Sequence, residues 1–116
     1  MEFQNEFSLE HRTKEFERIK SKYPNRVPII VERYENVDRS LPELTKKKFL
    51  VPRNITFGQF LYILRTRMEL PPEKALFVFV NNVLPLNSEQ VNTIYEEHKS
   101  EDGFLYCCYS SENTFG

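Results

Sequence analysis

The C-terminal end of the chain carries one group that is suited to covalent chemistry. The sequence ends on Gly116 after a polar stretch over residues 110–114 and Phe115. A glycine carboxylate has no Cβ beside it, so it can enter a narrow channel and, once activated, be attacked from either side. Seven extended residues reach at most ~25 Å, which is enough to enter another protein's active site. An ordinary unreactive chain end is the alternative.

Cysteine and histidine are the other side chains that could react. Cys107 and Cys108 are adjacent, and neighbours on an extended strand point to opposite faces, so they do not easily pair with each other. In a thiol enzyme, one of them would be the nucleophile and His98 its base. Thiols in apolar strands, however, react poorly because burial raises their pKa. His11 and His98 lack the spacing of metal ligands. We therefore expect reduced thiols in a cytosolic or nuclear protein without a cofactor.

Length and charge limit the number of domains and the classes of partner. A chain of 116 residues with 40% hydrophobic residues fits one domain with its own core. The net charge of −1 gives no bulk field that favours nucleic acid or a membrane surface. The acidic first six residues do not resemble a secretory signal, and no stretch approaches the ~20 apolar residues of a membrane span.

Three strands carry the strongest patterns. Residues 104–109 are apolar at every position and too few for a helix, which indicates a buried central strand. Strands are also predicted over residues 27–31 and 46–52, as an antiparallel pair. Three lysines at one end of the second strand and Pro52 at the other are typical of an exposed edge.

A helical region is predicted over residues 1–23, with Ser8 as an N-cap. Its inner face is formed by Leu9, Phe16, Ile19 and Tyr23. Arg12 belongs to the opposite, mixed-charge face, which we expect to be solvated. Phe3 and Phe7 form a short apolar patch ahead of this helix. The helix packs on the domain or, as the alternative, inserts into a membrane.

A second helix is predicted to begin after the cap Thr56. Its buried stripe consists of Phe57, Phe60, Leu61, Leu64 and Met68. Ile63 lies beside this stripe, which suggests the wall of a groove close to the edge strand. A strand over residues 75–80 follows. Asn87 with Gln90 resembles a capping box for a helix through residues 91–98.

The order helix, strand, strand, helix, strand, helix, strand predicts an α+β fold, the ubiquitin-like β-grasp. Strands that are apolar on both faces need a cover on both. We expect residues 1–24 to be an additional helical extension packed on the sheet. Residues 25–109 would form the β-grasp core, and residues 110–116 a flexible tail for conjugation.

Six sequence runs resemble the ubiquitin-like autophagy modifiers of the GABARAP family. They are YPNRVP at 23–28, KKKFLVP at 46–52, GQF at 58–60, FVNN at 79–82, YEEH at 95–98 and GFLY at 103–106. The tail ENTFG at 112–116 is also similar. The N-terminus is slightly shorter than usual and the loop over residues 34–45 slightly longer. Family precursors often continue beyond the glycine, whereas this sequence stops there.

The resemblance implies attachment of Gly116 to phosphatidylethanolamine on autophagosomal membranes. The activating and conjugating enzymes would supply all catalytic groups, and a cysteine protease would process and release the modifier. The protein would be cytoplasmic, becoming lipid-anchored on autophagosomal membranes after conjugation. It would recruit motif-bearing cargo receptors and would itself be no enzyme, with no nucleic-acid partner.

The resemblance also implies a docking site for short aromatic-x-x-aliphatic motifs at the edge strand. The aromatic pocket would be lined by Glu17, Ile19, Pro28, Ile30, Lys48, Leu50 and Phe104. The aliphatic pocket would be lined by Phe49, Val51, Pro52, Ile55, Phe60 and Ile63. Acidic residues beside the motif would meet Lys46, Lys47, Lys48 and Arg67. The processing and conjugation enzymes would contact Arg65, Phe77 and Phe79.

Simpler roles stay open for several of these residues. Ile30 and Leu50 are equally well explained as core, whereas the patterns place Phe49 and Ile63 off the core. The three lysines would also serve as a solubilising edge. A purely noncovalent peptide-binding adaptor of the same fold is the alternative function.

Overall fold

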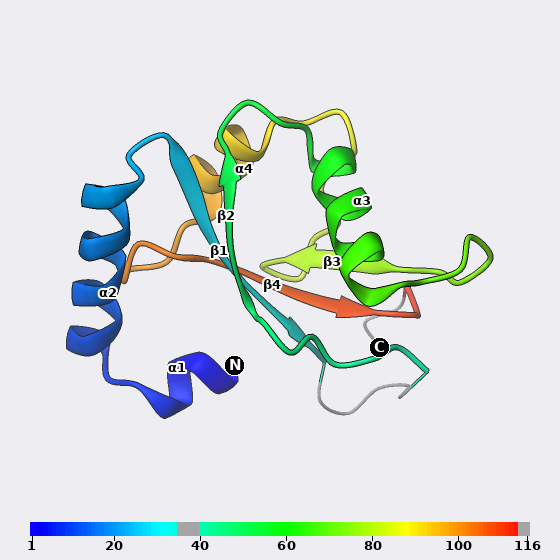
Figure 1. Cartoon of the computed structure of the whole chain (residues 1–116), viewed down its shortest axis with the longest axis horizontal. Coiled ribbons are helices and arrows are strands. Elements are labelled where there is room, and N and C mark those ends of the chain that lie inside the picture. The colour runs from blue at the N-terminus through cyan, green and yellow to red at the C-terminus, as the bar shows by residue number, and fades with distance from the viewer. Residues whose placement is uncertain (35–39, 114–116) are drawn as a thin grey trace.

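Four strands form one mixed sheet in the order β2-β1-β4-β3 (Figure 1). This computed structural model describes residues 1–34 and 40–113. The strands are β1 (Arg26–Arg33), β2 (Lys48–Pro52), β3 (Phe77–Val80) and β4 (Leu105–Ser110). Part of the predicted loop over residues 34–45, and Gly116 itself, lie outside the described residues.

The register of the sheet confirms the predicted positions of β2 and β4. β2 pairs antiparallel with β1, with Ile29 opposite Phe49, and stands at the edge of the sheet. β4 lies between β1, to which it runs parallel, and β3, to which it runs antiparallel. Because successive side chains of a strand alternate between faces, Phe49 and Leu50 point to opposite sides of the sheet.

Helix α3 (Phe57–Met68) covers one face of the sheet. It begins with the predicted cap, since the Thr56 hydroxyl accepts from the Gln59 amide and the Gln59 side chain accepts from the Thr56 amide. The helix ends at Glu69, which adopts a left-handed conformation with φ of 54°. Phe57, Phe60, Leu64 and Met68 are buried against the sheet, and Leu61 is partly buried.

Helices α1 (Glu2–Glu6) and α2 (Leu9–Lys22) cover the other face. Figure 1 shows α2 and α3 on either side of the sheet. Phe3 and Ile19 join Ile30 and Phe104 in a second, smaller core. This confirms the N-terminal extension as an addition packed on the sheet. The inner face predicted for α2 is wrong at both ends, because Leu9 and Tyr23 are each 40% exposed.

The prediction of a solvated Arg12 is also wrong. Its guanidinium donates to Asp102 at 2.6 Å, and the two side chains are 12% and 0% exposed. The hydroxyl of Tyr106 donates to the same carboxylate. Arg12 therefore attaches α2 to the turn before β4, because a buried carboxylate needs a partner.

Helix α4 (Val91–His98) begins differently from the predicted capping box. Gln90 is its N-cap and makes no side-chain capping bond. The first helical amides instead donate to the loop after β2: Val91 N–H to the Ile55 carbonyl at 2.8 Å, and Asn92 N–H to the Arg53 carbonyl at 3.0 Å. Backbone carbonyls thus satisfy the free amides of this helix end.

Candidate functional site

The outer edge of β2 presents backbone groups that do not pair with β1. Val31 N–H donates to the Lys47 carbonyl at 2.9 Å, and in this antiparallel register the inward-facing groups alternate along β2. The backbone groups of Lys48 and Leu50 therefore face away from β1. Arg26 Nη1 donates to the Leu50 carbonyl at 3.1 Å. An extended peptide can add to such an edge through its own backbone.

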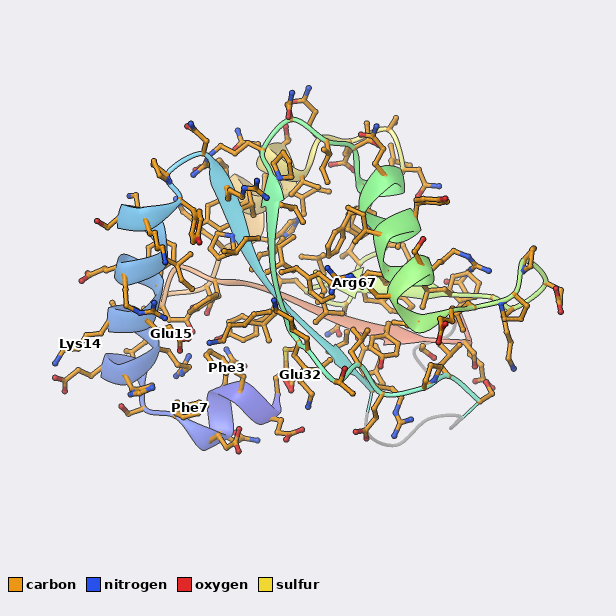
Figure 2. The ribbon with its side chains drawn as sticks, viewed as in Figure 1. Phe3, Phe7, Lys14, Glu15, Glu32 and Arg67 are labelled. Carbon is orange, nitrogen blue, oxygen red and sulfur yellow. The ribbon has the colours of Figure 1, made fainter. Side chains whose placement is uncertain are left out.

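A groove of about 520 Å³ follows this edge between α2 and α3. Ile19 and Leu50 line it on the α2 side, and Ile63 and Arg67 line it on the α3 side. Figure 2 shows Glu15 on the side of α2 that faces the sheet, and Lys14 on the opposite side. The groove thus joins two apolar surfaces across one open strand, which suits side chains that alternate along a bound strand.

The structure brings together part of the predicted aromatic pocket. Ile19, Lys48 and Leu50 line the groove. Ile30 and Phe104 lie beneath α1 and are fully buried, and Pro28 lines a separate hollow at the start of β1. Glu17 is exposed. Leu50 packs against the second core from the groove side. It therefore both belongs to the core and lines the groove, the two roles that the sequence left open.

The acidic side chain that lines the groove from α2 is Glu15 rather than Glu17. Glu15 and Ile19 are four residues apart, so they share one face of the helix, whereas Glu17 lies on the exposed side. Helical spacing from Ile19 was the signal that would have found Glu15. The Glu15 side chain is 15% exposed and contacts the Lys48 ammonium.

The structure also brings together some of the residues predicted for the aliphatic pocket. Phe49, Val51, Pro52 and Ile63 line the groove. Phe60 is completely buried, and Ile55 packs against the main core. The placement of Phe49 off the core is wrong, because it is only 6% exposed and packs edge-on against Phe60 at 6.0 Å between ring centroids.

Cationic side chains line the groove. Lys48 lies between Glu15 and the ring of Phe3, 5.4 Å from its centroid, and burial lowers the pKa of this lysine. Arg67 lies over the ring of Phe49 at 5.7 Å. Lys46 lines the groove. Lys46 therefore adds positive charge at the point where β2 begins, while Lys48 is partly shielded by Glu15.

Lys47 differs from its two neighbours because it holds α1 in place. Its ammonium lies 2.8 Å from the Glu2 carboxylate, and this hydrogen bond raises the pKa of Lys47 and lowers that of Glu2. The buried Glu32 carboxylate accepts the amides of Glu2 at 3.0 Å and Phe3 at 3.3 Å (Figure 2). These bonds satisfy free amides at the start of α1, and Phe3 packs edge-on against Phe104.

The residues predicted to contact the enzymes lie away from the groove. Arg65 turns back onto the loop after α3, donating to the carbonyls of Pro71 at 2.9 Å and Lys74 at 2.7 Å. Phe77 is partly buried, whereas Phe79 is 4% exposed and packs edge-on against Tyr34. Arg65 therefore has a structural role in the folded chain.

The thiols differ in accessibility. Cys107 is buried, and burial raises the pKa of its thiol. Cys108 is partly buried, and the His98 ring nitrogen Nδ1 lies 3.0 Å from Asn81 Nδ2. Over residues 1–34 and 40–113, no cluster of three metal-binding side chains is found. In the same residues, no helix has both the length and the apolarity to cross a bilayer.

Comparison with known proteins identifies the family. Residues 11–116 match the family described as autophagy protein Atg8, ubiquitin-like. The chain is also 54% identical over 114 residues to autophagy-related protein 8 of Mycosarcoma maydis, covering 98% of this chain and 95% of that protein. The chain belongs to the Atg8 family. This confirms the resemblance to the GABARAP-type autophagy modifiers.

Another Atg8 relative and a solved Atg8 structure support the same family assignment. Autophagy-related protein 8d of Arabidopsis thaliana is 54% identical over 114 residues, covering 98% of this chain and 93% of that protein. A solved structure, Plasmodium falciparum Atg8 in complex with a Plasmodium falciparum Atg3 peptide, has a TM-score of 0.86 and 40% identity, with 95% of each chain covered. The ubiquitin-like fold with its N-terminal helices is therefore the Atg8 fold.

Proposed function

We propose that this Atg8-family protein is a modifier that is joined through Gly116 to phosphatidylethanolamine on autophagosomal membranes. An activating enzyme would adenylate the glycine carboxylate and pass it to a cysteine as a thioester, and the lipid amine would then displace the thiol. Family membership supports this reaction, as does a tail that leaves the sheet from β4 after Ser110. The catalytic groups belong to the partner enzymes.

The groove gives the modifier its second activity, the capture of motif-bearing cargo receptors and autophagy factors. The observation that carries this proposal is the open edge of β2, whose Lys48 and Leu50 backbone groups face the groove. An aromatic side chain would enter beside Ile19 and Leu50, and an aliphatic one beside Val51 and Ile63. Lys46, Lys48 and Arg67 would attract acidic residues of the peptide.

A peptide of the conjugating enzyme is a further partner. The Plasmodium falciparum Atg8 structure contains an Atg3 peptide, and its similarity to this chain supports an equivalent contact here. A cysteine protease would process and later release the modifier, with the partly buried Phe77 among its predicted contacts. The protein would thus move between the cytoplasm and autophagosomal membranes, and would act through residues 1–24, 25–109 and 110–116 as extension, core and tail.

Reconstitution tests the proposal. The chain is incubated with the activating and conjugating enzymes, ATP and liposomes that contain phosphatidylethanolamine. The expected product is a lipid adduct at Gly116, seen by mass spectrometry of the intact protein and of its C-terminal peptide. Peptide binding without an adduct would instead favour a noncovalent adaptor and would contradict conjugation.

A further inference from the structure

The tail leaves the sheet from an anchored position. Tyr109, the residue before the last in β4, is completely buried. Its hydroxyl donates to the Pro42 carbonyl at 2.7 Å and accepts from the Leu44 amide at 3.2 Å. Its backbone carbonyl accepts from the Tyr34 amide at 3.1 Å. Contacts on three sides of Tyr109 therefore fix the end of β4, and the tail begins at a defined place on the domain.

The next residue turns the chain. Ser110, the last residue of β4, is only 6% exposed. Buried hydroxyl groups need a partner, and Ser110 Oγ accepts the Glu112 amide at 3.0 Å. A serine hydroxyl that binds the amide two residues later closes a local turn. The backbone bends at Ser111, and Figure 1 shows the chain turning sharply just beyond the β4 arrow.

This turn ends the pairing between β3 and β4. Phe77 lies opposite Ser110, and this is the last pair of the two antiparallel strands. Two further residues in the same register would place Ala75 opposite Glu112. The sequence predicts a strand over residues 75–80, but β3 begins at Phe77. The strand is shorter than predicted because the chain that would pair with its first residues turns away at Ser110.

Without this turn, the tail can extend the sheet instead of leaving it. Ala75 is exposed and Leu76 is partly buried, and an exposed stretch of backbone beside the end of a sheet accepts an added strand. Residues 111 and 112 are covalently joined to β4, so their pairing costs little loop-closure entropy. A tail held on the sheet must be released before an enzyme binds it, so only the released fraction is a substrate.

We propose that the Ser110 hydroxyl is a positioning group for conjugation, which keeps the tail off β3 and available to the activating enzyme. The inference rests on the proposed conjugation of Gly116. In this role Ser110 acts through the backbone of Glu112 and not on the reacting carboxylate. Loss of the hydroxyl lowers the fraction of chains with a released tail. The apparent affinity of the enzyme for the modifier then falls, while the chemical step is unchanged.

The exchange of labelled pyrophosphate into ATP tests the inference, because it reports reversible attack of the glycine carboxylate on the α-phosphate of ATP. The full chain is the varied substrate of the activating enzyme at saturating ATP. The test variant is Ser110→Ala, and Ser110→Thr is the conservative variant that keeps a hydroxyl. A double variant adds Ala75→Pro to Ser110→Ala, since proline disfavours pairing of residue 75 with the tail.

We expect Ser110→Ala to raise KM about fivefold at unchanged kcat, as for the loss of one hydrogen bond that stabilises the released tail. Ser110→Thr and the double variant should have KM values near that of the wild type. In the NMR spectrum of Ser110→Ala, a nuclear Overhauser contact should join the backbones of residues 75 and 112. Motif-peptide binding at the β2 groove should be equal in all four proteins.

An unchanged KM for Ser110→Ala, or a raised KM that the double variant does not restore, would overturn the inference. A parallel loss of motif-peptide binding in Ser110→Ala would also overturn it, because Ser110 would then only support the fold. Absence of exchange with the wild-type chain, at intact peptide binding, would instead contradict the proposed conjugation of Gly116 and with it the role of Ser110.

Discussion

Arg12 and Asp102 lie ninety positions apart in the sequence and 2.6 Å apart in the structure. The Asp102 carboxylate is fully buried, and it also accepts the Phe104 amide at 2.9 Å. Burial opposes the charge of Arg12, but its hydrogen bonds with Tyr106 and Asp102 hold the Arg12 pKa above its ordinary value. The pair thus joins the N-terminal extension to the core.

We expect Arg12→Ala to lower the free energy of unfolding by about 3 kcal/mol, because it leaves a buried carboxylate without its partner. Urea denaturation followed by circular dichroism measures this change. Lys14→Ala on the exposed side of the same helix is the control and should change stability by less than about 0.5 kcal/mol. Equal effects of the two substitutions would contradict the role assigned to Arg12.

Gly103 is predicted to be irreplaceable in the turn before β4. Its φ is 98°, and an added Cβ would lie 2.4 Å from the ring of Phe16. We expect Gly103→Ala to destabilise the fold by about 2 kcal/mol or more, from backbone strain and this clash. A double-mutant cycle with Phe16→Ala separates the two causes. If the clash matters, the changes in unfolding free energy of the two substitutions will be coupled. If these changes simply add, backbone strain is the sole cause of the effect of Gly103→Ala.

In the groove, Leu50→Ala and Ile63→Ala should each weaken binding of a motif peptide by at least about 1 kcal/mol, as for interface anchors. Leu86→Ala is the control, because Leu86 is 67% exposed and lies outside the groove. Phe49→Ala should also weaken binding, but it removes a buried ring and should cost about 3 kcal/mol of stability. Calorimetry showing unchanged affinity for Leu50→Ala and Ile63→Ala would remove the groove assignment.

Glu15 and Glu17 offer a matched test of charge at the groove. Glu15→Gln removes the carboxylate beside Lys48 and should increase affinity for peptides with an acidic residue next to the motif, by roughly threefold at low salt. Glu17→Gln changes the same net charge on the exposed side of α2 and should have a smaller effect. A larger effect of Glu17→Gln would show that the sequence-based assignment was right.

Alkaline pH should destabilise the fold. Burial raises the pKa of Tyr34 to about 12 and raises the pKa values of Tyr106 and Cys107 above their ordinary values. These groups hold their protons more tightly when folded, so their stabilisation is complete below their unfolded pKa values, from about 8.5 for the thiol to about 10 for the phenols, and falls as pH rises.

Urea denaturation at pH values from about 8 to about 11 measures this slope. Tyr34→Phe removes one of the titrating groups and should flatten the slope. Iodoacetamide should label Cys107 only on unfolding, because burial keeps it a neutral thiol. Rapid labelling of Cys107 in the folded state would contradict this account and revive the thiol-enzyme hypothesis.

Features with local causes could be predicted from the sequence. The Thr56 cap depends on a residue three positions away, and the edge position of β2 follows from its own lysines and Pro52. The buried strand β4 is apolar along its length. The order of these elements predicted the ubiquitin-like fold, and the position of Ile63 beside the buried stripe suggested a groove close to the edge strand.

Features with distant causes could not be predicted in this way. Arg12 has the character of a surface residue until Asp102 is placed beside it, and α4 is capped by backbone carbonyls of the loop after β2. The sequence pattern also could not show that α1 covers Ile30 and Phe104, because this depends on the Glu32 carboxylate binding the start of α1.

Membrane sedimentation tests the central claim most directly. Cells that express the wild-type chain and cells that express Gly116→Ala are fractionated under conditions that induce autophagy, and the protein is measured in the membrane pellet. We expect a pelleting, lipid-linked form of the wild type and none of Gly116→Ala, because the added methyl group lies beside the reacting carboxylate. Equal pelleting of the two proteins would contradict conjugation through the C-terminal glycine.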